Sequence, residues 1–329
     1  MTNVPLLTPE EIAVRAGHEA PALHLPLRAE VFAEREIRLR QLAAGHAMRE
    51  YLLLMADLTG AQHELLQSYP QVPLPDADAL QAAARSRKPP LPAELWARDP
   101  HWREGLHQLL DALLPRLPTG PARSAVASLR SLDPDALERQ AGRLLRNDTS
   151  GFDLAAAPFV AAALQVHWTH LVLATAEAHG VEHLSPFGRI DDATRCPCCG
   201  FVPVASVTRL EPAFGSLRYL QCALCAAQWH MVRIKCSRCE STRGIHYQSL
   251  EPLRSGGEPR LKAAVEAETC DECRSYLKIV RRDRDPQVEP VADDLASLTL
   301  DLLVSEAGFQ RHGVNLLLLF GEPDGSEGA

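Results

Sequence analysis

The sequence predicts a mainly α-helical N-terminal domain, then a small metal-bound β module of two rubredoxin-like or zinc-ribbon-like units, and finally a C-terminal helix. Two observations carry this prediction. All nine cysteines of the 329 residues lie between Cys196 and Cys273, and outside that stretch Ala and Leu are plentiful and aromatic residues scarce, which favours helix. We expect an all-α domain over residues 1–190, a tandem four-cysteine module over 191–285, and a C-terminal helix and tail over 286–329.

The N-terminal region is divided into helices by its prolines. After an irregular start over residues 1–25, at least one long helix is predicted within residues 26–68, a charged stretch rich in Ala and Leu. An amphipathic helix follows, and it ends at the prolines that begin with Pro115. Its apolar face consists of Trp102, Leu106, Leu109, Leu110 and Leu113. Asp133 is a suitable N-cap for a further helix over residues 134–145.

Residues 154–179 are apolar on nearly every side, so we predict a buried central helix that ends at Gly180. Gln165, His167 and His170 interrupt this stretch, and we therefore expect no membrane insertion. The two histidines, at i and i+3, have a spacing that can bind a metal. Hydrogen-bonded core histidines are nevertheless the favoured interpretation, because a single His pair is a weak signal.

Short segments that are rich in β-branched or aromatic residues and bounded by turns predict strands in the cysteine-containing part. These segments are residues 202–207, 217–221, 228–234 and 276–280. Residues 283–290 look like a linker, after which Pro290 suits the first turn of the final helix. The apolar stripe of that helix consists of Val291, Leu295, Leu298 and Leu302.

Eight of the cysteines form four Cys-x-x-Cys pairs, which supply enough thiolates for two tetrahedral four-sulfur metal sites. The pairs are Cys196/Cys199, Cys222/Cys225, Cys236/Cys239 and Cys270/Cys273, separated by 22, 10 and 30 residues. The two longer gaps fit a β-hairpin between the halves of one unit, and the short gap fits a connection between units. We therefore predict that the first pair shares a metal with the second, and the third with the fourth. A cross-braced arrangement is less favoured.

Metal binding is favoured over disulfides because the first seven residues do not resemble a signal peptide, and cytosolic thiols stay reduced. Four-sulfur sites suit both zinc and iron. Gly200, directly after the first pair, tolerates the positive φ that turns backbone N–H groups toward sulfur. The other pairs are followed by Ala226, Glu240 and Arg274, so we do not expect this feature to be repeated.

Other side chains near the cysteines have simpler interpretations. Cys198 is expected to be a spare thiol that points away from the metal, because two ligands adjacent in sequence strain a knuckle. His230 and His246 are not needed as ligands beside eight paired cysteines. Trp229 and Tyr247 are expected to pack in a small core rather than to stack on nucleic-acid bases.

The net charge of −8 is unevenly distributed. Residues 196–282 carry 13 Lys and Arg against 8 Asp and Glu, which leaves −13 for the rest of the chain. With eight thiolates and two divalent metals the module is close to neutral. The sequence therefore argues against nucleic acid as a partner, since nucleic acid rewards a strong basic excess. The chain has no P-loop, glycine-rich dinucleotide motif, nucleophile elbow or His-Glu-x-x-His motif, and nothing resembles a catalytic nucleophile beside a base.

The segments around the cysteines resemble a known family. They are Cys196-Pro-Cys-Cys-Gly-Phe-Val-Pro-Val-Ala-Ser, Leu217-Arg-Tyr-Leu-Gln-Cys-Ala-Leu-Cys, Gln228-Trp-His-Met-Val-Arg-Ile-Lys-Cys-Ser-Arg-Cys and Cys270-Asp-Glu-Cys-Arg-Ser-Tyr-Leu-Lys-Ile. The later segments Ala292-Asp-Asp-Leu-Ala-Ser-Leu-Thr-Leu-Asp and Gly308-Phe-Gln-Arg add to the likeness. The chain is similar to the FdhE family, the formate dehydrogenase accessory proteins, most specifically from about Arg195 onward.

This resemblance implies a cytoplasmic protein that is not an enzyme. It implies an assembly chaperone that binds the catalytic subunit of a respiratory formate dehydrogenase and assists its maturation before export. It also implies a helical domain joined to two rubredoxin-like units, in which the eight paired cysteines hold two metal ions, with iron favoured and zinc possible. The chain departs from the family at Cys198, at Arg274, where Gly is expected, and at Asn315, which is followed by Leu where Asn-Pro-Phe is common.

Two other functions stay open at this point. A zinc-ribbon protein that binds nucleic acid is compatible with four cysteine pairs, although the charge distribution argues against it. A rubredoxin-like electron carrier requires iron and an exposed knuckle. Self-association into a homo-oligomer is compatible with the sequence.

Overall fold

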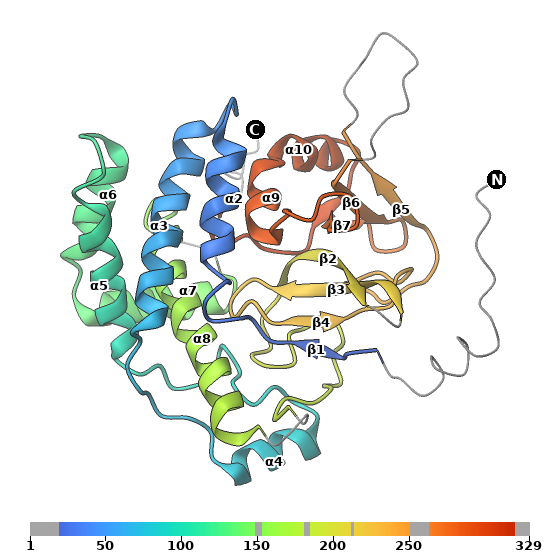
Figure 1. Ribbon diagram of the computed structural model, residues 1–329, viewed down its shortest axis with the longest axis horizontal. Helices are drawn as coiled ribbons and strands as arrows, with labels where there is room; N and C mark the ends of the chain where they lie inside the picture. The colour runs from blue at the N-terminus through green and yellow to red at the C-terminus, as the bar shows by residue number, and fades with distance from the viewer. Residues whose placement is uncertain (1–19, 149–152, 181–184, 212–213, 251–262, 320–329) are drawn as a thin grey trace, which may run out of the picture.

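The computed structural model describes residues 20–148, 153–180, 185–211, 214–250 and 263–319. In this part of the chain, helices from the N-terminal half lie beside a sheet built mainly from the C-terminal half, and two short helices near the C-terminus lie against that sheet (Figure 1). The predicted fold class is confirmed, because a helical region precedes a sheet region that contains both four-cysteine groups. The proposed domain boundaries after residues 190 and 285 stay predictions.

Seven helices are described in the N-terminal region. They are α2 (Ala33–Ala43), α3 (Arg49–Gln67), α4 (Ala77–Ser86), α5 (His101–Leu113), α6 (Pro121–Arg130), α7 (Pro134–Leu145) and α8 (Ala157–His179). The stretch predicted as at least one long helix contains two, α2 and α3, separated by a turn in which Gly45 has φ 73°. Asp133 caps α7 as predicted, accepting a hydrogen bond from the Ala136 N–H at 2.8 Å.

Two of these helices, α4 and α6, were not predicted, because prolines near them were interpreted only as breakers. Pro121 occupies the first turn of α6, a position that needs no N–H donor. Asp76 lies just after a proline cluster and caps α4 by accepting from the Ala79 N–H at 2.8 Å. Prolines therefore mark a helix start here as well as a helix end.

Helix α8 is the buried central helix that the sequence predicts. By length and composition it could cross a membrane, but 89% of its apolar 18-residue stretch is buried inside the protein, as in the core helix of a folded domain. Its two histidines have partners from other parts of the chain: Tyr69 Oη lies 2.9 Å from His167 Nδ1, and Arg28 Nη1 lies 3.5 Å from His170 Nδ1. The two histidines are therefore hydrogen-bonded core residues, and neither belongs to a metal-binding group among the described residues.

One mixed sheet contains both cysteine units. Its strands are β1 (Leu23–His24), β2 (Pro203–Glu211), β3 (Gly215–Cys222), β4 (Gln228–His230), β5 (Ile245–Gln248), β6 (Val265–Cys270), β7 (Ser275–Arg281) and β8 (Gln310–Arg311). They are arranged in the order β1-β4-β3-β2-β7-β6-β5, and β8 pairs with β7. Strands β2 and β7 run parallel, with Ser206 opposite Ile279, and so join the two units. Each unit thus keeps its own antiparallel strands within a shared sheet.

The strand predictions were correct in place but incomplete. Strands β5, β6 and β8 were missed, and β4 ends at His230, so the predicted strand over residues 228–234 is too long. Within the N-terminal stretch predicted as irregular, Leu23 pairs with Trp229 and His24 with Gln228, which makes β1 an edge strand of the sheet. The beginning of the described chain is thereby attached to the first cysteine unit.

The predicted final helix is two helices, α9 (Pro290–Ala296) and α10 (Leu298–Glu306), with a break at Ser297. Ser297 Oγ bonds back to the Asp293 carbonyl at 2.7 Å, and its φ and ψ of −112° and 34° are not helical. Leu302 is consequently 66% exposed and does not belong to a buried stripe. The linker predicted over residues 283–290 is also wrong at its end, because Val288 and Glu289 are buried.

Helix α9 connects the two halves through buried ion pairs. Its N-cap Glu289 pairs with Arg35 at 3.1 Å, and Asp293 receives two hydrogen bonds from Arg38, at 2.7 and 2.9 Å. Both arginines belong to α2. Burial raises the pKa of Asp293, and the Arg38 guanidinium opposes that rise. The same helix also faces the sheet, where Asp294 accepts from the fully buried Lys278 at 3.1 Å.

We expect Arg38→Met to destabilise the protein by roughly 3 kcal/mol, because Asp293 then stays buried without its cationic partner. The measurement is the urea unfolding midpoint at neutral pH. In Arg38→Met/Asp293→Asn the carboxylate is replaced by a neutral amide that can still accept the Glu289 N–H, so much of the loss should be recovered. A double variant as unstable as the single one would show that the ion pair does not hold the halves together.

Candidate metal centres

The structure gathers the eight paired cysteines into two groups of four sulfurs. The first group is Cys196, Cys199, Cys222 and Cys225, and the second is Cys236, Cys239, Cys270 and Cys273. Within each group the sulfurs lie no more than 4.8 Å from one another. This grouping agrees with the predicted pairing of first with second and third with fourth, not with a cross-braced arrangement.

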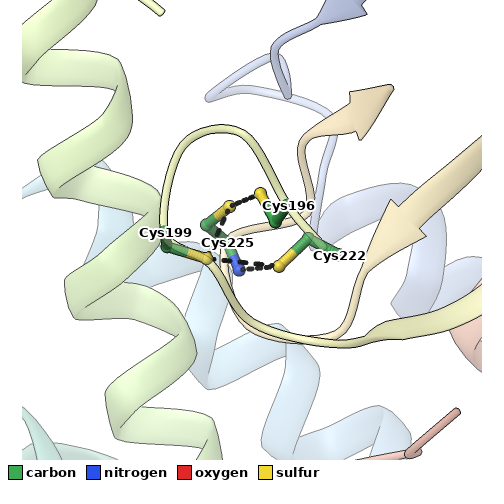
Figure 2. Close-up of side chains that lie close together, drawn as sticks. All are labelled: Cys196, Cys199, Cys222 and Cys225. Carbon is green, nitrogen blue, oxygen red and sulfur yellow. Dashed lines mark hydrogen bonds between the residues drawn. The ribbon is translucent and has the colours of Figure 1, made fainter. Parts of the chain in front are cut away.

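The spacing of the sulfurs fits a four-coordinate metal. In the first group the Sγ atoms of Cys199 lie 3.4 Å from Cys222 and 3.6 Å from Cys225, and Cys196 lies 3.6 Å from Cys225 (Figure 2). A Zn–S bond of about 2.3 Å gives a tetrahedral edge of about 3.8 Å. A disulfide bond of about 2.05 Å is far shorter, and all nine cysteines are free thiols. The group therefore has the dimensions of a metal site.

The second group has the same dimensions. Its Cys236 and Cys273 sulfurs lie 3.7 Å apart, and so do those of Cys239 and Cys270. Each group thus takes one pair from the start of its unit and one from a later turn next to a strand. The two sites differ in their surroundings rather than in their sulfur arrangement.

All four pairs have the same backbone turn, which corrects the expectation that only the first would show it. The residue after the second cysteine has a positive φ in every pair: Gly200 71°, Ala226 59°, Glu240 61° and Arg274 53°. In three pairs the first cysteine N–H donates to the carbonyl five residues later, as Cys222 does to Ala227 at 2.9 Å. Side chains at these positions cost energy in the left-handed region, so the turn is imposed by the geometry of the site.

The turns point backbone N–H groups at sulfur. The N–H groups of Leu224 and Cys225 lie 3.4 Å from the Cys222 sulfur. In the second group the Arg238 N–H lies 3.4 Å from the Cys236 sulfur. Hydrogen bonds of this kind favour the charged form of a thiol, which is the form that binds a metal.

The first group is enclosed, and the helical domain helps to enclose it. Its four cysteines are each at most 1% exposed. The N–H groups of Leu91 and Ala93 donate to the carbonyls of Cys198 and Cys199, at 3.1 and 2.8 Å. From α8, Gln165 donates to the Ala223 carbonyl at 2.7 Å. The proline-rich stretch around Leu91 was not recognised as part of the site, although its extended character was the available signal.

Burial also sets the protonation of the first group. It raises the pKa of the Cys199, Cys222 and Cys225 thiols well above their ordinary value. Cys196 is equally buried, but hydrogen bonds from the neighbouring thiols, Cys198 foremost, lower its pKa. Four thiolates in this enclosed space consequently require a cation beside them.

The second group is more open. Cys239 is exposed and Cys273 is partly exposed, whereas Cys236 and Cys270 are buried. Ser237, inside the third pair, contacts His312 through Oγ and Nε2 at 2.7 Å. Solvent therefore reaches one side of this site, while the opposite side rests on the segment that leads into the C-terminal residues.

The remaining candidate residues lie outside both groups. Cys198 is buried and is not one of the four sulfurs of the first group, and burial raises the pKa of its thiol. The thiol nevertheless interacts with those of Cys196 and Cys225, so the expectation that it points away from the metal is wrong. His246 Nε2 lies 3.0 Å from Asp271, and His230 is a half-buried residue of β4. Trp229 donates its indole N–H to the Ala193 carbonyl at 2.9 Å and packs in the core.

We expect Ala226→Gly to stabilise the protein by roughly 0.5 to 1 kcal/mol, because Gly adopts the φ of 59° without the steric cost of a Cβ. The matched control is Ala223→Gly in the same turn, where φ is not positive and Gly should destabilise by a similar amount. Both are compared by their urea midpoints. A loss of stability in Ala226→Gly would mean that the left-handed turn is not a source of strain.

Comparisons with known proteins agree with this architecture. Three family profiles match: "FdhE, N-terminal" over residues 20–184, "FdhE, central domain" over 195–233 and "FdhE, C-terminal domain" over 234–318. A Protein FdhE homolog from Cronobacter sakazakii and a Protein FdhE from Salmonella choleraesuis are each 37% identical over 309 residues, 94% of both chains. The crystal structure of the FdhE protein from Pseudomonas aeruginosa superposes with a TM-score of 0.75 and 38% identity, covering 92% of this chain and 100% of that one. The chain therefore belongs to the FdhE family, the formate dehydrogenase accessory proteins that its cysteine segments resemble.

Proposed function

We propose that this protein is a cytoplasmic assembly chaperone, not an enzyme, that binds the catalytic subunit of a respiratory formate dehydrogenase and assists its maturation before export. Membership in the FdhE family along most of the chain supports the proposal. The structural observation that carries it is the continuous sheet that contains both four-cysteine groups and is tied to the helices by buried ion pairs. Such a scaffold fixes the shape of a surface, which a protein that holds an immature partner requires.

We also infer that the eight paired cysteines bind two metal ions, one in each group. The sulfur spacing and the N–H groups directed at sulfur support this assignment. The resemblance favours iron, and zinc has the same four-sulfur geometry. When bound, the metal supplies positive charge that allows the buried thiols to ionise together.

We expect the two metals to be released in separate phases by a chelator, the second group losing its metal first. Cys239 and Cys273 are accessible to solvent, whereas the first group is enclosed by α8 and by residues 91–93. The measurement is metal content and far-UV circular dichroism against time in chelator. Release of both metals in one phase would contradict the structural difference between the sites.

Two substitutions assign the phases. Cys270→Ser should remove the early phase and leave a folded protein with one metal. Cys222→Ser should also leave one metal, but it should destabilise the protein by several kcal/mol, because the first site lies within the main hydrophobic core. Two metals per chain in either variant would mean that the ligand sets are wrong.

The function is tested by affinity capture under anaerobic conditions from cells that make a respiratory formate dehydrogenase. We expect the catalytic subunit to be recovered with the tagged, metal-loaded protein. Extract from cells that lack this subunit is the control for nonspecific capture. Absence of the subunit from the captured material would contradict the proposal.

The exposure of the second group favours one alternative, a rubredoxin-like electron carrier. The same capture experiment separates the two functions if the protein is loaded with zinc, which carries out no redox chemistry. A chaperone should still bind the catalytic subunit in the zinc form and support its maturation. Dependence of maturation on iron would instead support electron transfer, and salt-sensitive binding to DNA or RNA would favour the nucleic-acid alternative.

A further inference from the structure

A cavity of about 710 Å³ lies between the first cysteine turn and the segment that leads into the second group. One wall comes from residues 187–197, and the other from β4 and residues 231–235, with Leu23 of β1 at the side. This volume is typical of cavities that bind a ligand rather than of packing defects. Neither metal binding nor the proposed chaperone function assigns this cavity a role.

The floor of the cavity is apolar. Phe187, Trp229 and Met231 line it, and each is at most 5% exposed. Apolar surface continues outward along the chain, where Val232 and Ile234 are 57% and 59% exposed. A ligand that covers both the floor and this continuation must be extended, which favours a polypeptide segment over a compact small molecule.

The rim of the cavity carries positive charge. Arg87, Arg189, Arg195 and Lys235 line it, with Asp191 as the one carboxylate among the lining residues. Asp191 is paired with Arg87 at 2.6 Å, and Lys235 is paired with Glu240. The exposed Arg189 and Arg195 have no carboxylate partner among the described residues. Two guanidinium groups are therefore available to an anionic ligand.

The walls are held in place before any ligand arrives. The Asp191 N–H donates to the Arg87 carbonyl at 3.1 Å, and the Trp229 indole N–H fixes the Ala193 carbonyl at 2.9 Å. Pro197 of the wall lies inside the first Cys-x-x-Cys pair, and Lys235 directly precedes the third. Both cysteine groups thus define the cavity, and preorganised walls lower the entropic cost of binding.

We propose that this cavity binds an extended acidic segment of the client polypeptide, with apolar side chains over Trp229 and Met231 and carboxylates at Arg189 and Arg195. The proposal rests on the proposed function for the identity of the client, the formate dehydrogenase catalytic subunit. An acidic peptide suits the site better than nucleic acid does, because two unpaired arginines on a chain of net charge −8 are a small basic excess above a buried apolar floor.

The test uses the metal-loaded protein and fluorescently labelled peptides that tile the catalytic subunit, with binding measured by fluorescence anisotropy. We expect one or a few peptides of net negative charge to bind, and Arg189→Ala/Arg195→Ala to weaken them at least about tenfold with a shallower salt dependence. The matched control is Arg116→Ala/Arg139→Ala, which removes two exposed arginines that do not line the cavity. Metal content of two per chain in both variants shows that the fold is intact.

A second measurement locates the bound segment. Val232→p-benzoylphenylalanine places a photo-crosslinker at the cavity mouth, and mass spectrometry identifies what it joins. We expect an acidic segment of the catalytic subunit. Crosslinks only to a neutral or basic segment, to residues 1–19 of this chain or to RNA would overturn the proposal, as would equal peptide binding by the two double variants or no peptide binding at all. If acidic peptides bind here but the intact subunit is never captured, the proposed function fails and the peptide site stands.

Discussion

The arrangement of the two halves depends on the ion pairs that the carboxylates of α9 and its N-cap form. Asp293 and the N-cap Glu289 face two arginines of α2, while Asp294 faces Lys278 of β7 and Arg311 of β8. Adjacent side chains on one short helix therefore bind cations of the helical region on one side and of the sheet on the other. Because these groups are buried, removing one partner of a pair costs much more folding free energy than the formation of the pair contributes. Only an arrangement of α2, α9 and the sheet that pairs all of these charges avoids that cost.

The first cysteine group is a product of that meeting rather than an independent module. Its sulfurs belong to the same hydrophobic core as α3, α5 and α8, and the backbone at residues 91–93 pairs with its first turn. The second group has no such cover and contacts mainly strands of its own unit and the segment around His312. Two sites of the same sulfur geometry therefore differ in accessibility because only one lies at the junction of the halves.

The sequence could predict those features that short-range spacing determines. The interval between cysteine pairs gave the correct grouping, and apolar continuity identified α8, because both signals are contained within a few turns of chain. The break between α9 and α10 was missed, since it depends on Ser297 and on Lys278, which bonds to the Asp294 carbonyl from another element. The left-handed residues Ala226, Glu240 and Arg274 were missed for a different reason. Their conformation accompanies hydrogen bonds within each cysteine turn, and the local preference of these residue types opposes it.

The cavity proposed as a peptide site adjoins both cysteine groups. Its walls leave the first cysteine turn at Pro197 and reach the second group at Lys235, so both ends of the surface are fixed where the sulfurs fix the backbone. A partner bound in the cavity would not contact the sulfurs. It would contact only the surface whose shape the two cysteine groups hold. A structural role at the first site and an exchangeable ion at the second are then compatible, because metal loss from the open site would loosen one wall while the enclosed site kept the other. The proposed peptide site therefore depends on the first cysteine group for one wall and on the second for the other.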